Sequence, residues 1–374
     1  MIRLATMLFS LSTAFALPAF AATPATIQSD KAAFVLEPVS EGFGVPWGMA
    51  FIGENQLLIT AREGHIHLLD TRTRKTIRLQ GAPAVLAEGQ GGMLDVAVPP
   101  DFTPDDWIYF TFVRDRNGDG VTVLARARLR GHTLVQWQDL LETRSATGSS
   151  QHFGSRIAFD ESGHVYFGVG DRGERPDGQD RSNHAGCVMR LKRDGSVPGD
   201  NPFIGQADVL PEIWSYGHRN PQGMAYDPVH KRLWLIEHGP RGGDEINLIS
   251  AGRNYGWPVI SYGKEYWGPV AVGEGTHRQG MEQPIKQYTP SIAPGSLLLY
   301  SGKAFPAWRG NLFAGALKLR HINRVTLDAR GNAIGEERLL SDLGERIRAL
   351  AESPQGWIYF STDSGKVYRI KPGA

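Results

Sequence analysis

Five cationic residues fall at comparable places in a chain of repeating apolar strands, close to where one strand ends or another begins. They are Arg219, Lys318, Arg320, Arg346 and Arg348. If the strands are arranged around an axis, these side chains converge, and converging cations repel one another unless an anion lies among them. The placement therefore predicts a site for a small polycarboxylate.

A second segment offers the ligands of a hard cation. Gly239 and Pro240 are followed within a few residues by Asp244 and Glu245. Backbone carbonyls and carboxylates are the oxygen donors that Ca²⁺ prefers. Any one of these residues alone is better explained by a turn or a surface salt bridge. Their joint placement with the cations predicts a site with both a metal and an anion.

His152 is the candidate catalytic base. It is one of 11 histidines, and taken alone it reads as a packed or solvated imidazole. Its segment, residues 151–154, directly precedes an apolar strand, as do the loops at 88–92 and 216–223. Loops at strand ends are where a rigid scaffold places its functional residues. This position, beside the cations and the Gly239–Pro240 segment, turns His152 into a candidate.

Two other motif matches fail on their context. Residues 168–173 (GVGDRG) fit the dinucleotide fingerprint, but the chain continues as a loop where that fingerprint requires a helix. Residues 115–120 (DRNGDG) imitate the start of an EF-hand loop, but Arg126 replaces the glutamate expected at its twelfth position. We expect a loop at the first segment and a hairpin turn at the second.

The elements that must position these residues are strands joined by short turns, with almost no helical periodicity. Six pairs of apolar strands recur, at residues 47–51 and 57–60, 94–98 and 107–112, 156–159 and 164–169, 223–226 and 232–236, 297–300 and 311–315, and 347–350 and 356–360. All-strand units repeating every several tens of residues are typical of a β-propeller. We therefore predict an all-β, six-bladed β-propeller.

Further strands and connections follow from this architecture. Outer strands are expected at 65–69 and 365–370, and residues 33–36 are expected to close the ring by joining the C-terminal blade. The widest gap between blocks, from the fourth to the fifth, should form loops on the functional face. A pair of large β-sandwiches is the alternative, although it would not predict one motif used throughout.

Composition and the N-terminus restrict the class of protein. Residues 1–21 read as a signal peptide, with a short positive start and a short apolar run that ends in a small-x-small cleavage pattern. Residues 22–374 then form a single propeller domain, exported across the inner membrane and expected in the periplasm. Net charge is +1 without a basic stripe, which argues against a nucleic-acid partner. No later segment is apolar enough to span a membrane, and the single Cys187 forms no disulfide within the chain.

Three motifs carry a resemblance that covers essentially the whole mature chain: residues 217–223 (GHRNPQG), 237–245 (EHGPRGGDE) and 254–258 (NYGWP). With them the chain resembles the soluble aldose sugar dehydrogenases, the glucose/sorbosone dehydrogenase family that uses pyrroloquinoline quinone (PQQ). The resemblance implies oxidation of the C1 hydroxyl of an aldose to a lactone, by hydride transfer to Ca²⁺-bound PQQ. The reduced quinone then passes its electrons to an unidentified acceptor.

The resemblance also implies residue roles. His152 would be the base, and Arg219 would help Ca²⁺ to polarise the quinone carbonyl. The residues expected to hold the quinone are Gln90, Arg219, Asn220, Tyr266, Lys318, Leu319, Arg320, Arg346, Ile347 and Arg348. The carbonyls of Gly239 and Pro240 would bind the Ca²⁺ on the cofactor, and Glu245 and Tyr255 would belong to a second, structural calcium site.

One departure concerns the base. Where relatives can carry an aspartate just before it, this chain has Gln151. An amide does not stabilise an imidazolium as a carboxylate does, so a lowered pKa of His152 is expected.

Two other functions remain open at this point. One is a secreted propeller that only binds a carbohydrate or a protein, because a fold does not by itself determine a function. The other is a calcium-dependent lactone hydrolase, which would require a carboxylate-rich metal centre facing the central cavity.

Overall fold

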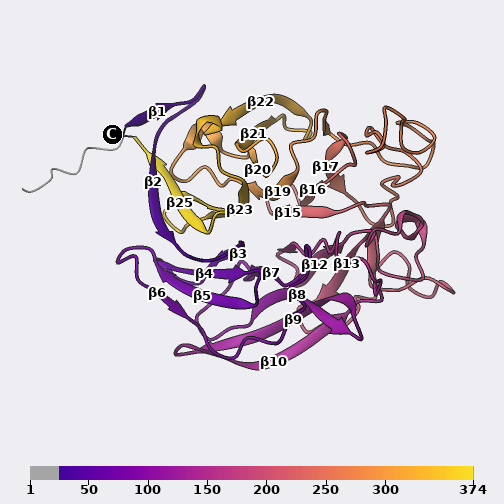
Figure 1. Ribbon diagram of the computed structural model, residues 1–374, viewed down its shortest axis with the longest axis horizontal. Helices are drawn as coiled ribbons and strands as arrows, with labels where there is room; N and C mark the ends of the chain where they lie inside the picture. Colours follow the sequence, from indigo (N-terminus) through magenta and orange to yellow (C-terminus); the bar gives the residue numbers. More distant parts are fainter. Residues whose placement is uncertain (1–24, 374) are drawn as a thin grey trace, which may run out of the picture.

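The computed structural model describes residues 25–373, so the predicted signal peptide lies outside the described residues. The chain forms six antiparallel sheets arranged around a central axis (Figure 1). Five sheets have four strands and one has five. This confirms the predicted six-bladed propeller. Within residues 25–373, helix is limited to the short 3₁₀ turns η1 (Arg175–Gln179), η2 (Pro306–Trp308) and η3 (Ser341–Leu343).

The blades follow one another along the chain. Blades 1 to 3 are β3 (Pro46–Phe51), β4 (Gln56–Ala61), β5 (His65–Asp70) and β6 (Thr76–Arg78); β7 (Met93–Ala97), β8 (Ile108–Arg116), β9 (Asp119–Arg130) and β10 (Thr133–Glu142); and β11 (Ile157–Phe159), β12 (His164–Val169), β13 (Cys187–Lys192) and β14 (Ile213–Tyr216). Blades 4 to 6 are β15 (Pro221–Asp227), β16 (Arg232–Glu237), β17 (Asp244–Ile249) and β18 (Lys286–Tyr288); β19 (Pro294–Leu299), β20 (Leu312–Ala316), β21 (Ile322–Leu327) and β22 (Ala333–Leu339); and β23 (Ile347–Glu352), β24 (Ile358–Thr362) and β25 (Lys366–Pro372) with β1 (Thr26–Gln28) and β2 (Ala33–Glu41).

The six predicted strand pairs are the two innermost strands of the six blades. The innermost strands β3, β7, β11, β15, β19 and β23 contact one another in that order around the axis. The second strands, such as β4, β20 and β24, are buried along almost their whole length. A strand that packs against a neighbouring blade on both faces needs apolar side chains on both, which explains the near-continuous apolar runs.

Six apolar clusters fill the six interfaces between neighbouring blades. One joins blades 1 and 2, for example, through Leu58, Ile66 and Phe110, and another joins blades 6 and 1 through Leu57 and Tyr359. The remaining four lie between blades 2 and 3, 3 and 4, 4 and 5, and 5 and 6. A ring of six equivalent interfaces excludes the pair of β-sandwiches.

The two ends of the described chain close the ring. β2 pairs with β25 as the fourth strand of blade 6, so that Phe34 lies opposite Pro372 and Leu36 opposite Ile370. In Figure 1 the indigo β2 lies beside the yellow β25. Phe34 is fully buried in the cluster between blades 5 and 6. The predicted closure by residues 33–36 is confirmed.

One buried cation occupies the axis of the ring. Arg156 precedes β11, and its guanidinium donates to the Asp95 carboxylate (2.8 Å) and lies 4.0 Å from the centre of the Trp47 ring. It also donates to the backbone carbonyls of Gln222 (2.9 Å), Gly295 (2.6 Å) and Arg348 (3.1 Å). These partners come from the five other blades. Arg156 therefore joins all six blades at the axis.

The two segments that imitate known motifs have the structures expected of them, a hairpin turn and a loop. Residues 115–120 form the β8–β9 hairpin, in which Asn117 and Gly118 make the turn with positive φ (59° and 95°). Residues 168–173 end β12 and enter a loop that leads into η1, a single 3₁₀ turn.

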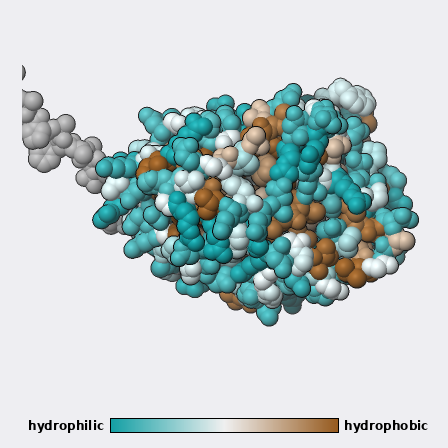
Figure 2. Space-filling view, turned by 90° about the horizontal axis from the view of Figure 1, so that it is seen from below, coloured by the Kyte–Doolittle hydropathy of each residue, from teal (hydrophilic) through white to brown (hydrophobic). Residues whose placement is uncertain are grey.

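Figure 2 shows a face on which hydrophilic side chains predominate and apolar ones form separate patches. Among residues 25–373, no helix has the length and apolar character needed to cross a membrane.

Candidate active site

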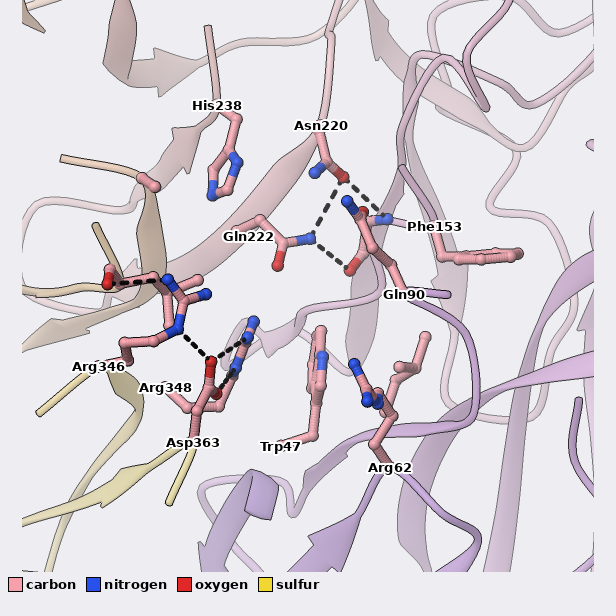
Figure 3. Close-up of a pocket in the computed structure, with 14 residues that line it drawn as sticks. Trp47, Arg62, Gln90, Phe153, Asn220, Gln222, His238, Arg346, Arg348 and Asp363 are labelled. Carbon is pink, nitrogen blue, oxygen red and sulfur yellow. Dashed lines mark hydrogen bonds and ion pairs between the residues drawn. The ribbon is translucent and has the colours of Figure 1, made fainter. Parts of the chain in front are cut away.

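One face of the propeller gathers the loops that sequence analysis singled out. In every blade the start of the innermost strand lies beside the end of the second strand, as in the pairs Pro46 with Ala61 and Ile347 with Thr362. The loops that enter the first strand and leave the second therefore share a face, which we call the site face. A cavity of about 230 Å³ opens at its centre (Figure 3). Its lining comes from all six blades: Trp47, Arg62, Gln90, Leu94, Phe153, Gly154, Asn220, Gln222, His238, Ala293, Leu317, Arg346, Arg348 and Asp363.

His152 is 7% exposed and does not itself line this cavity, but it directly precedes Phe153 and Gly154, which do. Its backbone has a positive φ of 57°, which is uncommon for a residue other than glycine. The Gln90 side-chain oxygen accepts the His152 N–H at 2.9 Å. The expected base and the expected quinone ligand Gln90 are therefore neighbours.

The carboxylate of Asp171 orients the imidazole of His152. His152 Nδ1 lies 2.6 Å from Asp171 Oδ1, and the same carboxylate accepts the Gly173 N–H (2.9 Å) and Trp257 Nε1–H (2.8 Å). Burial opposes ionisation of Asp171, but its hydrogen bonds and the charge of Arg219 hold its pKa below the ordinary value. An ionised carboxylate can only accept, so Nδ1 carries the hydrogen and the lone pair is on Nε2.

Burial lowers the pKa of His152, the hydrogen bond to Asp171 opposes this, and the charge of Arg219 adds to the lowering. The direction agrees with the expectation from Gln151, but the cause is different. A carboxylate is present after all, and it comes from the loop after β12. The imidazole is therefore neutral at neutral pH and has a free lone pair, as a general base requires.

A glycine brings this loop into place. A Cβ atom at Gly170 would lie 2.5 Å from the carbonyl oxygen of His152 and 2.8 Å from that of Arg219. The loop can pass between these two residues only without a side chain at position 170. Asp171 lies within the segment that matched the dinucleotide fingerprint, and sequence reasoning missed it. Its position directly after a second strand, like that of Asp363 in blade 6, is the signal that could have found it.

Arg219 and Asn220 lie where the chain enters β15. The Arg219 guanidinium donates to the carbonyls of Gly239 (2.8 Å) and His238 (3.3 Å). The Asn220 side-chain oxygen accepts the Gly154 N–H (3.3 Å) and lies 3.2 Å from the Gln222 amide nitrogen. Both residues are buried. Asn220 lines the central cavity, whereas Arg219 lines the smaller cavity that Gly239 and Glu245 also line.

Arg346 and Arg348 line the cavity as predicted, but the anion between them belongs to the protein. Asp363 accepts from Arg346 Nε (2.8 Å) and from Arg348 Nε and a terminal nitrogen (2.8 and 3.0 Å), as Figure 3 shows. Burial opposes its ionisation, yet the two guanidinium groups keep the pKa of Asp363 below its ordinary value. One carboxylate thus balances part of the predicted positive charge.

The other predicted quinone residues lie outside the lining of this cavity. Lys318 is exposed and borders a separate groove with Arg241 and Lys264. The remaining four are Leu319, which packs against the blade 4–5 cluster; Arg320, which donates to the Gly344 carbonyl; Ile347, which is fully buried in the blade 5–6 cluster; and Tyr266, which is 66% exposed. The described geometry therefore brings together only part of the predicted set.

A second imidazole lines the cavity. His238 is half-buried, and its Nε2 lies 2.6 Å from the Pro294 carbonyl oxygen, to which it donates. Burial lowers its pKa to about 3. His238 therefore adds no charge to the cavity, and sequence reasoning gave it no role.

Three of the four predicted calcium residues, Gly239, Glu245 and Tyr255, line a smaller cavity of about 20 Å³. Pro240 does not line it, whereas Glu237 and Ser261 do. Burial and the charge of Glu237 raise the pKa of Glu245 to about 8. Glu237 is buried and Glu245 is half-buried, and two neighbouring carboxylates in such a place are costly without a cation. The donor set of this cavity therefore fits a small hard cation, with Glu237 as a donor that sequence reasoning missed.

The other predicted donors are partly engaged. The Tyr255 hydroxyl donates to the Leu248 carbonyl (2.6 Å) and accepts the Ser250 N–H (2.9 Å), so only its backbone carbonyl remains as a donor. The Gly239 carbonyl accepts from Arg219, and its N–H donates to Asp244 Oδ1 at 3.0 Å. Across residues 25–373, no group of three or more His, Cys, Asp or Glu side chains forms a metal site. Both predicted calcium sites would therefore depend strongly on backbone carbonyls.

Comparison with known proteins agrees with this geometry. The aldose sugar dehydrogenase of Escherichia coli is 37% identical over 94% of both chains. Quinoprotein glucose dehydrogenase B of Acinetobacter calcoaceticus is 27% identical over 88% of this chain and 84% of its own. The PQQ-bound aldose sugar dehydrogenase of Streptomyces coelicolor superimposes with a TM-score of 0.75 at 26% identity, covering 92% of this chain and 99% of its own.

The family model for glucose/sorbosone dehydrogenases matches residues 43–369, which include the two innermost strands of all six blades but not the closing strands β1 and β2. The resemblance seen in the three sequence motifs is thereby confirmed. The chain belongs to the glucose/sorbosone dehydrogenase family.

Proposed function

We propose that this chain oxidises the C1 hydroxyl of an aldose to a lactone, with PQQ as the hydride acceptor and His152 as the general base. The single observation that carries the proposal is the buried His152–Asp171 pair beside a cationic cavity. Relatives named as aldose sugar dehydrogenases, one of them PQQ-bound, support the same reaction. The sugar preferred and the physiological electron acceptor are left open.

The cavity fits a polycarboxylate such as PQQ. The lining contributes three guanidinium groups, of Arg62, Arg346 and Arg348, but only one carboxylate, that of Asp363, and His238 is neutral. The cavity therefore has an excess of positive charge that an anionic ligand can balance. Gln90 and Asn220 would hold polar atoms of the quinone, together with Arg219, Arg346 and Arg348. Lys318, Leu319, Arg320, Ile347 and Tyr266 are proposed only from the resemblance.

When bound, PQQ accepts the hydride from C1, and Ca²⁺ makes the quinone carbonyl a better acceptor. His152 Nε2 takes the proton from the C1 hydroxyl as C1 loses hydride, so the sugar leaves as a lactone. The Asp171 carboxylate stabilises the imidazolium that forms and keeps Nδ1 protonated. Arg219 places a positive charge beside the reacting groups, where negative charge develops.

Metal binding is proposed at two places. The carbonyls of Gly239 and Pro240 would contact the ion at the quinone. The Gly239 carbonyl also accepts a hydrogen bond from the Arg219 guanidinium, so the ion would compete with Arg219 for this oxygen. Glu245, Glu237 and the Tyr255 carbonyl would hold a second, structural ion, which would offset the repulsion between the two neighbouring carboxylates. Export to the periplasm is also proposed, from residues 1–21 alone.

The experiment that tests the function is reconstitution. PQQ and Ca²⁺ are added to metal-free protein, and reduction of a dye is followed with glucose and other aldoses. We expect quinone to bind and the dye to be reduced with at least one aldose. If no aldose reduces the dye and no quinone binds, a propeller that only binds its ligand becomes the better description. A lactone hydrolase is less favoured, because the single carboxylate that lines the described cavity is paired with two arginines.

The role of His152 has its own test. His152→Ala should bind quinone as before but lose about 10²–10⁴-fold in kcat, the contribution of a general base. His230→Ala is a matched control, because His230 pairs with Asp227 in the β15–β16 turn, at the opposite end of the blade. Full turnover by His152→Ala, with its pH profile intact, would refute the role.

A further inference from the structure

Arg62 is a cation of the central cavity to which no role has yet been given. It follows β4 in blade 1, at the place that Asp363 occupies after β24 in blade 6. Asp363 removes positive charge from the cavity, whereas Arg62 adds it. Figure 3 shows the Arg62 guanidinium near Trp47 and Gln90, on the other side of Trp47 from Arg348.

The backbone of Arg62 is fixed by the loops that enter blades 1 and 2. Its N–H donates to the Val45 carbonyl (2.9 Å), and its carbonyl accepts the Met93 N–H (3.0 Å). Gly92 packs so closely that a Cβ atom there would lie 1.9 Å from the Arg62 carbonyl oxygen. The side chain therefore starts from a rigid point at the cavity wall, which lowers the entropy cost of holding a ligand.

No protein anion neutralises this guanidinium. Within residues 25–373, no side chain forms an ion pair or hydrogen bond with it, and no dashed line reaches it in Figure 3. The neighbouring Glu63 carboxylate accepts the Val45 N–H instead (3.3 Å). Asp363 uses both oxygens for Arg346 and Arg348. A half-buried guanidinium without a partner is suited to an anionic group of a ligand.

We propose that Arg62 binds a carboxylate of the quinone at a place on the cavity wall that Trp47 separates from Arg348. This inference rests on the proposed function. Arginine suits the task because its planar fork can donate two parallel hydrogen bonds to a carboxylate. With cations at two separate places on the cavity wall, a tricarboxylate could be held through more than one of its carboxylates, which would fix its orientation as well as its affinity.

The test is a binding measurement that needs no turnover. Quinone is titrated into the full-length protein in the presence of Ca²⁺, and the Kd is obtained from quenching of tryptophan fluorescence, since Trp47 lines the cavity. Arg62→Gln should weaken binding about 10- to 100-fold, the usual effect of one charge-assisted hydrogen-bonded contact. Arg62→Lys keeps the charge but not the fork, so its Kd should lie between the two. Arg72→Gln, an exposed arginine in the β5–β6 turn of the same blade, should bind like the wild type.

Three outcomes would overturn the inference. The first is an equal Kd for Arg62→Gln and the wild type. The second is an unchanged quinone Kd with a raised KM for glucuronate but not for glucose, which would assign Arg62 to a substrate carboxylate. The third is a loss of quinone binding by Arg62→Gln that comes with a lower Tm or a changed circular dichroism spectrum, while a folded Arg62→Lys binds quinone like the wild type; the loss would then be a folding defect. If the wild type itself binds no quinone, the proposed function fails and this inference fails with it.

Discussion

Replacing Asp171 by asparagine gives a sharp test of the site, because the change is nearly isosteric. The carboxylate accepts three hydrogen bonds, from His152 Nδ1 and the Gly173 N–H on one oxygen and from Trp257 Nε1 on the other. An amide has one acceptor oxygen and one donor NH₂ group. If the amide oxygen faces His152, the NH₂ group faces Trp257 Nε1–H, and two hydrogen-bond donors meet without an acceptor. If it faces Trp257, the NH₂ meets Nδ1 and forces the hydrogen of the imidazole onto Nε2.

The magnitude follows from these contacts. A hydrogen bond to a charged group contributes about 1.5–3 kcal/mol. Since about 1.4 kcal/mol changes a rate tenfold, losing the stabilisation of the imidazolium should lower kcat about 10- to 150-fold. The reversed tautomer would lower it further, because Nε2 would then have no lone pair to accept the proton.

The assay is kcat and kcat/KM against pH with saturating quinone and Ca²⁺. Asp171 raises the pKa of His152, so its neutralisation should lower that pKa further. A base with a lower pKa stays unprotonated to lower pH, so the acidic limb of the profile should move to lower pH while the plateau falls. Asp177→Asn, in the 3₁₀ turn of the same loop, is the control and should leave both unchanged. A plateau within twofold of the wild type, or an acidic limb that moves to higher pH, would refute the argument.

Two further predictions concern the ring and the metal. Phe34→Ala should lower the free energy of unfolding by about 3–5 kcal/mol in urea denaturation, because it leaves a cavity beneath the closing strand β2. Ile334→Ala is the control, because Ile334 is 65% exposed. A loss below about 1 kcal/mol for Phe34→Ala would contradict this view of the closure. Ca²⁺ should raise the Tm of the wild type, because it binds only the folded state. Glu245→Gln should remove much of this increase, whereas Glu274→Gln, a change at an exposed residue, should keep it. An equal increase in all three proteins would place the structural ion elsewhere.

The fold could be predicted almost completely, because its signal is repeated. Each inner strand pair is buried on both faces, so its apolar run stands out from the polar turns around it. The closure by residues 33–36 could also be predicted, because a propeller ring is commonly closed by pairing the two ends of the chain in one blade. The outermost strands were harder to place: β6 (Thr76–Arg78) is short and exposed along its length, and its residues have no apolar pattern.

The site could be predicted only in part, because its geometry depends on which loops meet. His152 was found because it directly precedes an inner strand. Asp171 was missed because its contact with His152 depends on Gly170 passing between two loops, which no spacing reveals. Of the five cations expected to converge, only Arg346 and Arg348 line the central cavity, and the sequence does not show that Asp363 is paired with both of them. It also does not show that Lys318 faces a different groove.

The guanidinium of Arg156 has a consequence for how many blades the chain can have. Its nitrogens and its face are used by five partners from five different blades. A ring with a missing or misplaced blade would leave a donor of this buried cation unsatisfied, and breaking a buried ion pair costs about 3–5 kcal/mol. The full set of contacts forms only when the last blade is in place. Arg156 therefore couples the assembly of the cavity floor to closure of the ring, so that an incomplete propeller is penalised at the place where the ligand would bind.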